Sequence, residues 1–144
     1  MNKILIILGF ILFSSAYIMG QHNKVEGIWL TEEGDSKIKI YKAQNGKYYG
    51  QIIWLKKDEN KKDTKNPDES KRNKPIKGLI LMKGFEYDSS KEQWNKGTIY
   101  DPESGKTYSG FIWFENNSNE LHLKGYILGM KIAGRSTVWQ RSST

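Results

Sequence analysis

The chain has 144 residues, a formal charge of +7 from 23 basic and 16 acidic residues, and no cysteine. This length suits one domain with a modest hydrophobic core. The lack of cysteine excludes disulfide bonds, thiolate metal ligands and the cysteine-linked lipid anchor of bacterial lipoproteins. Stability must therefore come from hydrophobic packing and hydrogen bonds.

Residues 1–20 have the three-part pattern of a signal peptide. Lys3 supplies the positive start, residues 4–13 form an apolar run of ten, and small residues follow. The run is too short to span a bilayer, which needs roughly 20 apolar residues. We expect cleavage after Gly20, or after Ala16, and export to the periplasm or the cell exterior as a soluble protein that does not span the membrane.

Residues 21–144 would then be the mature protein, which we predict to be a single domain made of strands. Runs rich in Ile, Tyr, Trp and Phe alternate with clusters of Gly, Asn, Asp and Ser. Asn45-Gly46 is the strongest hairpin signal, because both central residues of such a turn need positive φ. Eight strands are predicted, at residues 27–31, 37–43, 47–56, 79–87, 93–100, 106–114, 120–127 and 133–141.

Because tight turns join most of these strands, consecutive strands should pair antiparallel. Eight such strands in so short a chain must either stack as a sandwich or close into a barrel, and closure removes the exposed edges that promote aggregation. We therefore predict an all-β fold, an eight-stranded antiparallel up-and-down barrel. A barrel of this size is either filled by side chains or has room for one small ligand.

One connection is much longer than a turn. Residues 56–78 contain nine basic and five acidic residues, no aromatic residue and only Ile76 as a large aliphatic one. Mixed charge of this kind is typical of a solvated loop. The alternatives are a lid over one mouth of the barrel and a contact surface for an anionic envelope component.

Alternation along the strands predicts which side chains face the barrel interior. The predicted inward set is Trp29, Ile38, Ile40, Ile53, Leu121, Leu123 and Trp139. Runs 47–56 and 106–114 are apolar on both faces, so alternation does not decide there. For some aromatic residues, alternation does not decide between lining a cavity and packing on the outside of the barrel. These are the candidate ligand-binding residues, since aromatic rings and hydroxyl groups suit an amphipathic ligand. These candidates are Tyr49, Trp54, Tyr100, Tyr108 and Trp113.

Neither a metal site nor a catalytic site is predicted. His22 and His122 are the only histidines and stand 100 residues apart. Gly105-Lys106-Thr107 lacks the glycine five residues earlier that a phosphate loop needs, and no Gly-x-Ser-x-Gly elbow occurs. We expect no enzyme activity and no cofactor. Export, and the concentration of positive charge in one loop, also argue against nucleic acid as a partner.

A turn motif lies between the fifth and sixth predicted strands. It consists of Asp101, Pro102, Gly105 and Lys106. Pro102 fixes φ early in the turn and Gly105 closes it. The Asp101 carboxylate can accept a backbone N–H two residues on, and Lys106 can pair with it across the turn. The motif is therefore predicted to set the register of these two strands.

The two ends of the predicted barrel sequence carry a paired motif. Gly27 and Trp29 lie in the first strand, and Trp139 and Arg141 lie in the last. First and last strands are neighbours in a closed meander, where a guanidinium stacked on an indole would seal one end of the barrel. This pairing resembles the calycin pattern of lipocalins, in which a Gly-x-Trp on the first strand meets an arginine from the final strand.

A closer resemblance covers residues 25–141. Five motifs occur in the order of the bacterial family called domain of unknown function 2147, which the chain resembles: Gly27-x-Trp29-x-Thr31, Tyr48-Tyr49-Gly50-x-Ile52, Asn66-Pro67-Asp68, Gly97-x-Ile99-Tyr100-Asp101-Pro102-x-x-Gly105-Lys106-x-Tyr108 and Trp139-x-Arg141. The resemblance implies a small exported protein with a lipocalin-like barrel and no established activity.

Two functions follow as expectations. The first is binding of a small apolar or amphipathic molecule inside the barrel. The alternative is an envelope interaction or structural module, whose barrel is filled by side chains and which contacts partners through its surface and its basic loop. A cavity of at least a few hundred Å³ would favour the first.

Overall fold

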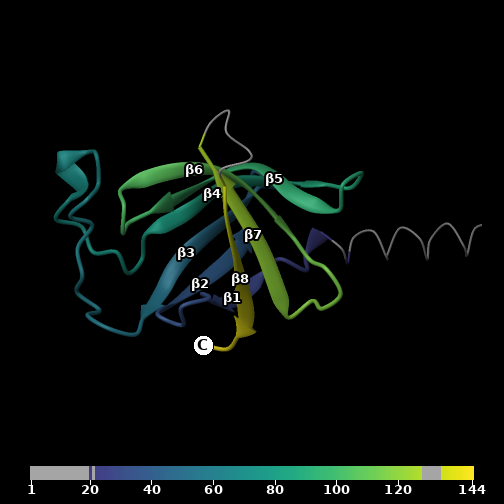
Figure 1. The fold of residues 1–144 in the computed structure, drawn as a ribbon, viewed down its shortest axis with the longest axis horizontal. Helices are drawn as coiled ribbons and strands as arrows, with labels where there is room; N and C mark the ends of the chain where they lie inside the picture. The colour runs from purple at the N-terminus through teal and green to yellow at the C-terminus, as the bar shows by residue number, and fades with distance from the viewer. Residues whose placement is uncertain (1–19, 21, 128–133) are drawn as a thin grey trace, which may run out of the picture.

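The computed structural model describes residues 20, 22–127 and 134–144 (Figure 1). Its regular elements are β1 Gly27–Leu30, β2 Ser36–Lys42, β3 Tyr48–Leu55, the short 3-10 helix η1 Glu69–Lys71, β4 Ile80–Asp88, β5 Gln93–Asp101, β6 Lys106–Trp113, β7 Glu120–Tyr126 and β8 Arg135–Ser142. Each predicted strand is present, with bounds within two residues of those expected. The predicted signal peptide, apart from Gly20, and the predicted strand residue Ala133 lie outside the described residues.

The strands close into one barrel in chain order, because β8 pairs antiparallel with β1. Trp29 of β1 lies opposite Arg141 of β8 in this closing register. Figure 1 shows the strands wrapping round a common interior, with the 56–78 loop projecting at one end. The prediction of an eight-stranded antiparallel up-and-down barrel is confirmed. No helix among the described residues is long and apolar enough to cross a membrane.

Alternate residues of the strands form the core, as a side-chain period of two requires. Six members of the predicted inward set are buried: Trp29, Ile38, Ile40, Leu121, Leu123 and Trp139. The prediction for Ile53 is wrong, because Ile52 is buried in its place. In the β2–β3 register Ile38 pairs with Ile52 but Lys37 pairs with Trp54, so Ile53 is the extra residue of a β-bulge.

The hairpin at Asn45-Gly46 keeps its predicted place but not its predicted geometry. Of the two residues Asn45 and Gly46, only Gly46 has a positive φ, which is 80°. The Asn45 side-chain oxygen accepts the Lys47 backbone N–H at 2.9 Å, and the Ala43 N–H donates to the Lys47 carbonyl at 2.9 Å. The connection is therefore wider than a two-residue turn, which removes the need for a second left-handed residue.

The two ends of the barrel differ. At the closed end, residues 22–26 run across the opening: Val25 is fully buried, and the Tyr48 hydroxyl donates to the His22 carbonyl at 2.6 Å. The rings of Trp94 and Phe114 meet edge to face there, 5.7 Å apart. At the opposite end, which we call the mouth, the β1–β2 turn, the β5–β6 turn and the start of the 56–78 loop surround an open space.

Candidate functional site

A cavity of about 820 Å³ opens at the mouth. Its walls come from the β1–β2 turn, the 56–78 loop, the β5–β6 turn and the first residues of β8, as well as from inward-facing strand residues. This volume lies within the range of small-molecule sites, which is about 300 to 1,000 Å³. The barrel is therefore filled by side chains at its closed end and hollow at its mouth.

The inner wall of this cavity is apolar. Five buried residues contribute to it, each from a different strand: Ile38, Ile52, Leu81, Leu123 and Trp139. Ile76 joins them from the 56–78 loop and is only 3% exposed. Such a wall favours the apolar part of a ligand, because burial there removes hydrocarbon from water.

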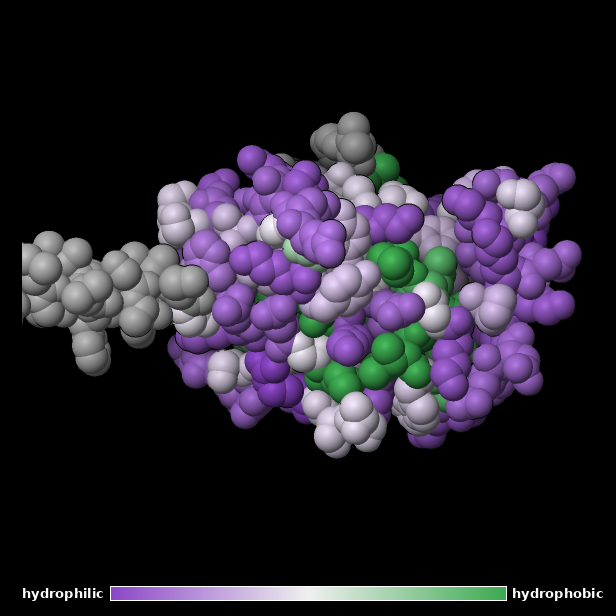
Figure 2. Space-filling model, turned by 180° about the vertical axis from the view of Figure 1, so that it is seen from behind, coloured by the Kyte–Doolittle hydropathy of each residue, from purple (hydrophilic) through white to green (hydrophobic). Residues whose placement is uncertain are grey.

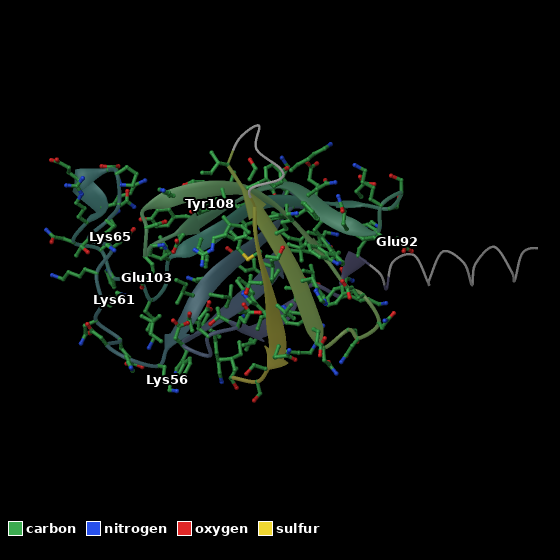
Figure 3. All side chains as sticks on the ribbon, viewed as in Figure 1. Lys56, Lys61, Lys65, Glu92, Glu103 and Tyr108 are labelled. Atoms are coloured by element: carbon green, nitrogen blue, oxygen red, sulfur yellow. The ribbon has the colours of Figure 1, made fainter. Side chains whose placement is uncertain are left out.

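The rim of the cavity carries charges of both signs. Its acidic residues are Glu32, Glu33, Asp35, Asp58, Asp101 and Glu103, and its basic residues are Lys56, Lys57, Lys61 and Arg135. Figure 3 shows Lys56, Lys61 and Glu103 at the mouth, and Glu92 at the opposite end. No group of three or more His, Asp and Glu side chains in the described part of the chain could hold a metal ion. The cavity thus grades from an apolar interior to a charged entrance.

Asp63 anchors the 56–78 loop to the barrel. Its carboxylate is 2% exposed, accepts the Tyr100 hydroxyl at 2.6 Å and accepts the Asn66 side-chain N–H at 2.7 Å. Burial, and then the hydrogen bond to Asp63, raise the pKa of Tyr100 above its ordinary value, so this hydroxyl remains a donor. The Asp63 backbone N–H also donates to the Lys74 carbonyl at 2.9 Å. The loop therefore has a solvated outer side and a fixed inner side.

The β5–β6 turn provides a second anchor. The Asp101 carboxylate accepts the Glu103 backbone N–H at 3.0 Å, and Gly105 has a φ of 72°. The Lys65 ammonium donates to the Glu103 carbonyl at 2.6 Å, and Lys61 pairs with the Glu103 carboxylate. A Cβ atom on Gly105 would lie 2.1 Å from the Lys65 carbonyl oxygen. The turn and the loop are thus in direct backbone contact beside the mouth.

Arg141 closes the other end of the barrel. Its guanidinium lies 4.2 Å from the centre of the Trp29 ring. It also donates to three backbone carbonyls, those of Glu26 at 3.0 Å, Lys24 at 2.8 Å and Ser118 at 3.0 Å. Burial lowers the pKa of Arg141 from its usual value, although the group keeps its charge at neutral pH. This arginine joins the N-terminal segment, the β6–β7 turn and β8.

Gly27 makes room for that guanidinium. A Cβ atom at this position would lie 2.7 Å from the Arg141 Nη1 atom, and the φ of Gly27 is 139°. Trp139, which precedes Arg141 by two residues on β8, instead lines the cavity. The four residues of the paired motif therefore divide between the two ends: three at the closed end and one in the cavity wall.

Two of the five candidate aromatic residues line the cavity, namely Tyr100 and Tyr108. The turn residues Asp101 and Pro102 line it as well, whereas Gly105 contacts the loop. Lys106 lies opposite Asp101 in the β5–β6 register. Residues 100–103 and Tyr108 thus form one side of the site.

The other three candidates lie on the outer surface. Tyr49 stacks beside Tyr41, with ring centres 6.1 Å apart. The Lys37 ammonium lies over the Trp54 ring, 5.4 Å from its centre. Trp113 stacks on a histidine ring of β7 at 5.4 Å. All three belong to strands that are apolar on both faces, which is why alternation along the sequence did not separate them from lining residues.

Two residues of the 56–78 loop that contribute to the site, Ile76 and Asp63, were not among the residues predicted from the sequence. Ile76 had a signal, because a single large aliphatic residue in a highly charged segment normally has a buried contact. Asp63 had none, since it is one of five acidic residues there and only the fold brings it to Tyr100. Contacts between a loop and a distant strand depend on the closed barrel.

Comparisons with known proteins agree with this barrel. Residues 27–141 match the family described as "Uncharacterized protein conserved in bacteria (DUF2147)". Among solved structures, the chain is similar to protein HP1028 from the human pathogen Helicobacter pylori, which is described as belonging to the lipocalin family. The two are 26% identical, the TM-score is 0.72, and the alignment covers 83% of each chain. No curated protein matches the chain.

Proposed function

We propose that this chain, which belongs to the DUF2147 family, is exported and binds one small apolar or amphipathic molecule in its lipocalin-like barrel. The observation that carries the proposal is the cavity of about 820 Å³ at the mouth. Its apolar wall would hold the hydrocarbon part of a ligand, and its charged rim would leave a polar group in contact with water. The proposed function is binding without a chemical step or a cofactor.

Export is supported by the sequence of residues 1–20. A positive residue, a ten-residue apolar run and small residues follow one another there, as in a signal peptide. We expect the protein recovered from the periplasm or the medium to begin at Gln21, or at Tyr17 if cleavage follows Ala16. The mass of the recovered protein distinguishes these two ends from an uncleaved chain.

Native mass spectrometry of protein purified from its own host tests the ligand proposal in the same measurement. We expect a small molecule to be retained under gentle conditions. Apolar ligands should also quench tryptophan fluorescence, because Trp139 lines the cavity. If only the ligand-free mass is found, and a panel of fatty acids and phospholipids causes no quenching, the proposal is wrong.

A matched pair of variants on β8 localises the site. Thr137 lines the cavity, whereas its neighbour Val138 pairs with His122 and lies on the other side of the strand. Thr137→Trp should fill part of the mouth and abolish retention of the molecule. Val138→Trp adds the same volume outside and should retain it. Equal retention by both variants would place the ligand elsewhere.

The second candidate function is an envelope interaction module. The observation that favours it is the 56–78 loop, which has a net charge of +4, projects beside the mouth and is fixed by Asp63. In that case the unaltered protein would carry no small molecule, and an anionic envelope component would bind to the loop. Neutralising Lys62 and Lys74, two exposed lysines of the loop, should then weaken this binding.

A further inference from the structure

One part of the outer surface lacks negative charge. Strands β1, β2 and β3 are neighbours in the barrel, and none of their residues is acidic. Strands β6 and β8 also lack acidic residues, whereas β4, β5 and β7 each contain Asp or Glu. We call the outward-facing side chains of β1, β2 and β3 the basic face. It is separate from the 56–78 loop, whose basic residues are interleaved with acidic ones.

The side chains of the basic face form three rows across the strands. The registers of the two strand pairs place Leu30 beside Lys37 and Trp54, Ile28 beside Lys39 and Gln51, and Tyr41 beside Tyr49. In each of the first two rows a lysine lies next to an aliphatic residue. Lys39 is exposed, and the other side chains of these rows are half-buried. Figure 2 shows hydrophobic side chains set among hydrophilic ones on the side of the barrel that lies behind β7 and β8 in Figure 1.

The aromatic rings of this face are already packed. Lys37 covers the Trp54 ring, and Tyr41 and Tyr49 lie 6.1 Å apart at 23° to each other. A nucleic-acid base or a sugar ring needs a free aromatic face on which to stack. Rings at a membrane surface need only an apolar body and a polar edge at the level of the lipid headgroups. Lysine stems can cover neighbouring apolar groups while their ammonium groups reach lipid phosphates.

We propose that the basic face docks this protein onto an anionic lipid bilayer. Exposed Lys39 attracts the phosphates together with Lys37, whose ammonium lies over the Trp54 ring and donates to the Ser143 carbonyl at 2.9 Å. Trp54 and the half-buried bulge residue Ile53 contact the headgroup region. Trp54 lies two residues before Lys56, which lines the cavity rim, so docking brings the mouth close to the membrane. The proposal does not depend on a ligand in the cavity.

Flotation with vesicles of phosphatidylcholine and phosphatidylglycerol at 3:1 tests this proposal at about 50 mM NaCl, where screening is weak. All variants carry the full chain and share one N-terminus, verified by mass, so any contribution of that end is the same throughout. The variant K37Q/K39Q should bind about 25-fold more weakly, because each lysine near such a surface contributes about fivefold. The matched control K91Q/K106Q removes the same charge from other strands and turns and should lose less than about fivefold.

Lys37 also contacts Trp54, so the melting temperature of K37Q/K39Q must be compared with that of the unaltered protein. If the double variant does not fold, K39Q alone should still lose about fivefold, since Lys39 is exposed. Equal losses for both lysine pairs would show a response to net charge only and overturn the proposal. So would failure of the unaltered protein to bind these vesicles, or tighter binding to a single-stranded oligonucleotide or an acidic polysaccharide.

Discussion

The closed end and the mouth are made by the same eight strands, but they use charged side chains in opposite ways. At the closed end one guanidinium is stacked on Trp29 and donates to three backbone carbonyls. At the mouth ten charged residues surround the cavity, and most keep their contact with water. Hydrogen bonds to a charged, half-buried group contribute about 1.5 to 3 kcal/mol, whereas an exposed ion pair contributes about 1 kcal/mol or less. The closed end should therefore carry stability and the mouth should tolerate change.

Replacing Arg141 tests this contrast most strongly. Arg141→Ala removes the stack on Trp29 and leaves three carbonyls without their donor, so we expect the free energy of unfolding to fall by about 3 kcal/mol. Arg135→Ala removes an arginine at the rim of the cavity and should change the free energy of unfolding by about 0.5 kcal/mol or less. Urea unfolding followed by tryptophan fluorescence measures both. Similar losses for the two variants would remove the distinction between the ends.

A pair of glycines sharpens the description of the mouth. Gly105 and Gly34 have nearly equal positive φ, 72° and 70°. Backbone strain from an alanine at either position should therefore lower the free energy of unfolding by about 1 kcal/mol. Only at Gly105 would the new Cβ meet the Lys65 carbonyl, while at Gly34 nothing lies within 4 Å. Gly105→Ala should therefore lose about 1 kcal/mol more than Gly34→Ala. The extra loss should appear as faster hydrogen exchange in residues 61–76.

Hydrogen exchange of the loop residues 61–76 decides between the two outcomes of this comparison. If Gly105→Ala and Gly34→Ala destabilise the protein equally, and the amides of residues 61–76 exchange at the same rate in both, the backbone contact between turn and loop does not hold the loop. The loop would then be held by its other contacts with the barrel, among them the Asp63–Tyr100 hydrogen bond, the Lys65–Glu103 hydrogen bond and the buried side chain of Ile76.

The closed end could be predicted from sequence much better than the mouth. The strand bounds throughout the barrel followed from composition and turn residues, and six of seven inward residues, three of which line the cavity, followed from alternation. Gly27, Trp29 and Arg141 were found because first and last strands must meet in a closed meander. Alternation failed at Ile53, where a bulge shifts the register of one strand against its partner.

The mouth depends on contacts that no local pattern encodes. Tyr100 and Asp63 are 37 residues apart and meet only because the loop folds back over the β5–β6 turn. Tyr108 lines the cavity while Tyr49 and Trp54 do not, although all three belong to strands with apolar residues on both faces. Which aromatic residues face inward was therefore undetermined until the register was known.

The Tyr100–Asp63 hydrogen bond gives the smallest expected effect and a distinct pH signature. The raised pKa of Tyr100 means that the folded protein keeps this proton when the unfolded chain, with a tyrosine pKa of about 10, loses it. The stabilisation by the protonated Tyr100 hydroxyl is complete below about pH 10 and is lost as the pH rises above that value. Tyr100→Phe should lower stability by about 1 kcal/mol at pH 7 and should make the alkaline loss shallower.

Tyr48→Phe is the matched variant at the closed end. Burial, and then the charge of Glu26, raise the pKa of Tyr48 in the same direction, but its hydroxyl donates to the His22 carbonyl and not to a carboxylate. Both variants should therefore flatten the loss of stability above about pH 10, whereas only Tyr100→Phe should also speed hydrogen exchange in residues 61–76 at pH 7. The free energy of unfolding of Tyr100→Phe could instead change with pH from about pH 9 to 11 just as that of the unaltered protein does. Tyr100 would then ionise alike in the folded and unfolded states, which would contradict the assignment of Asp63 as its buried acceptor.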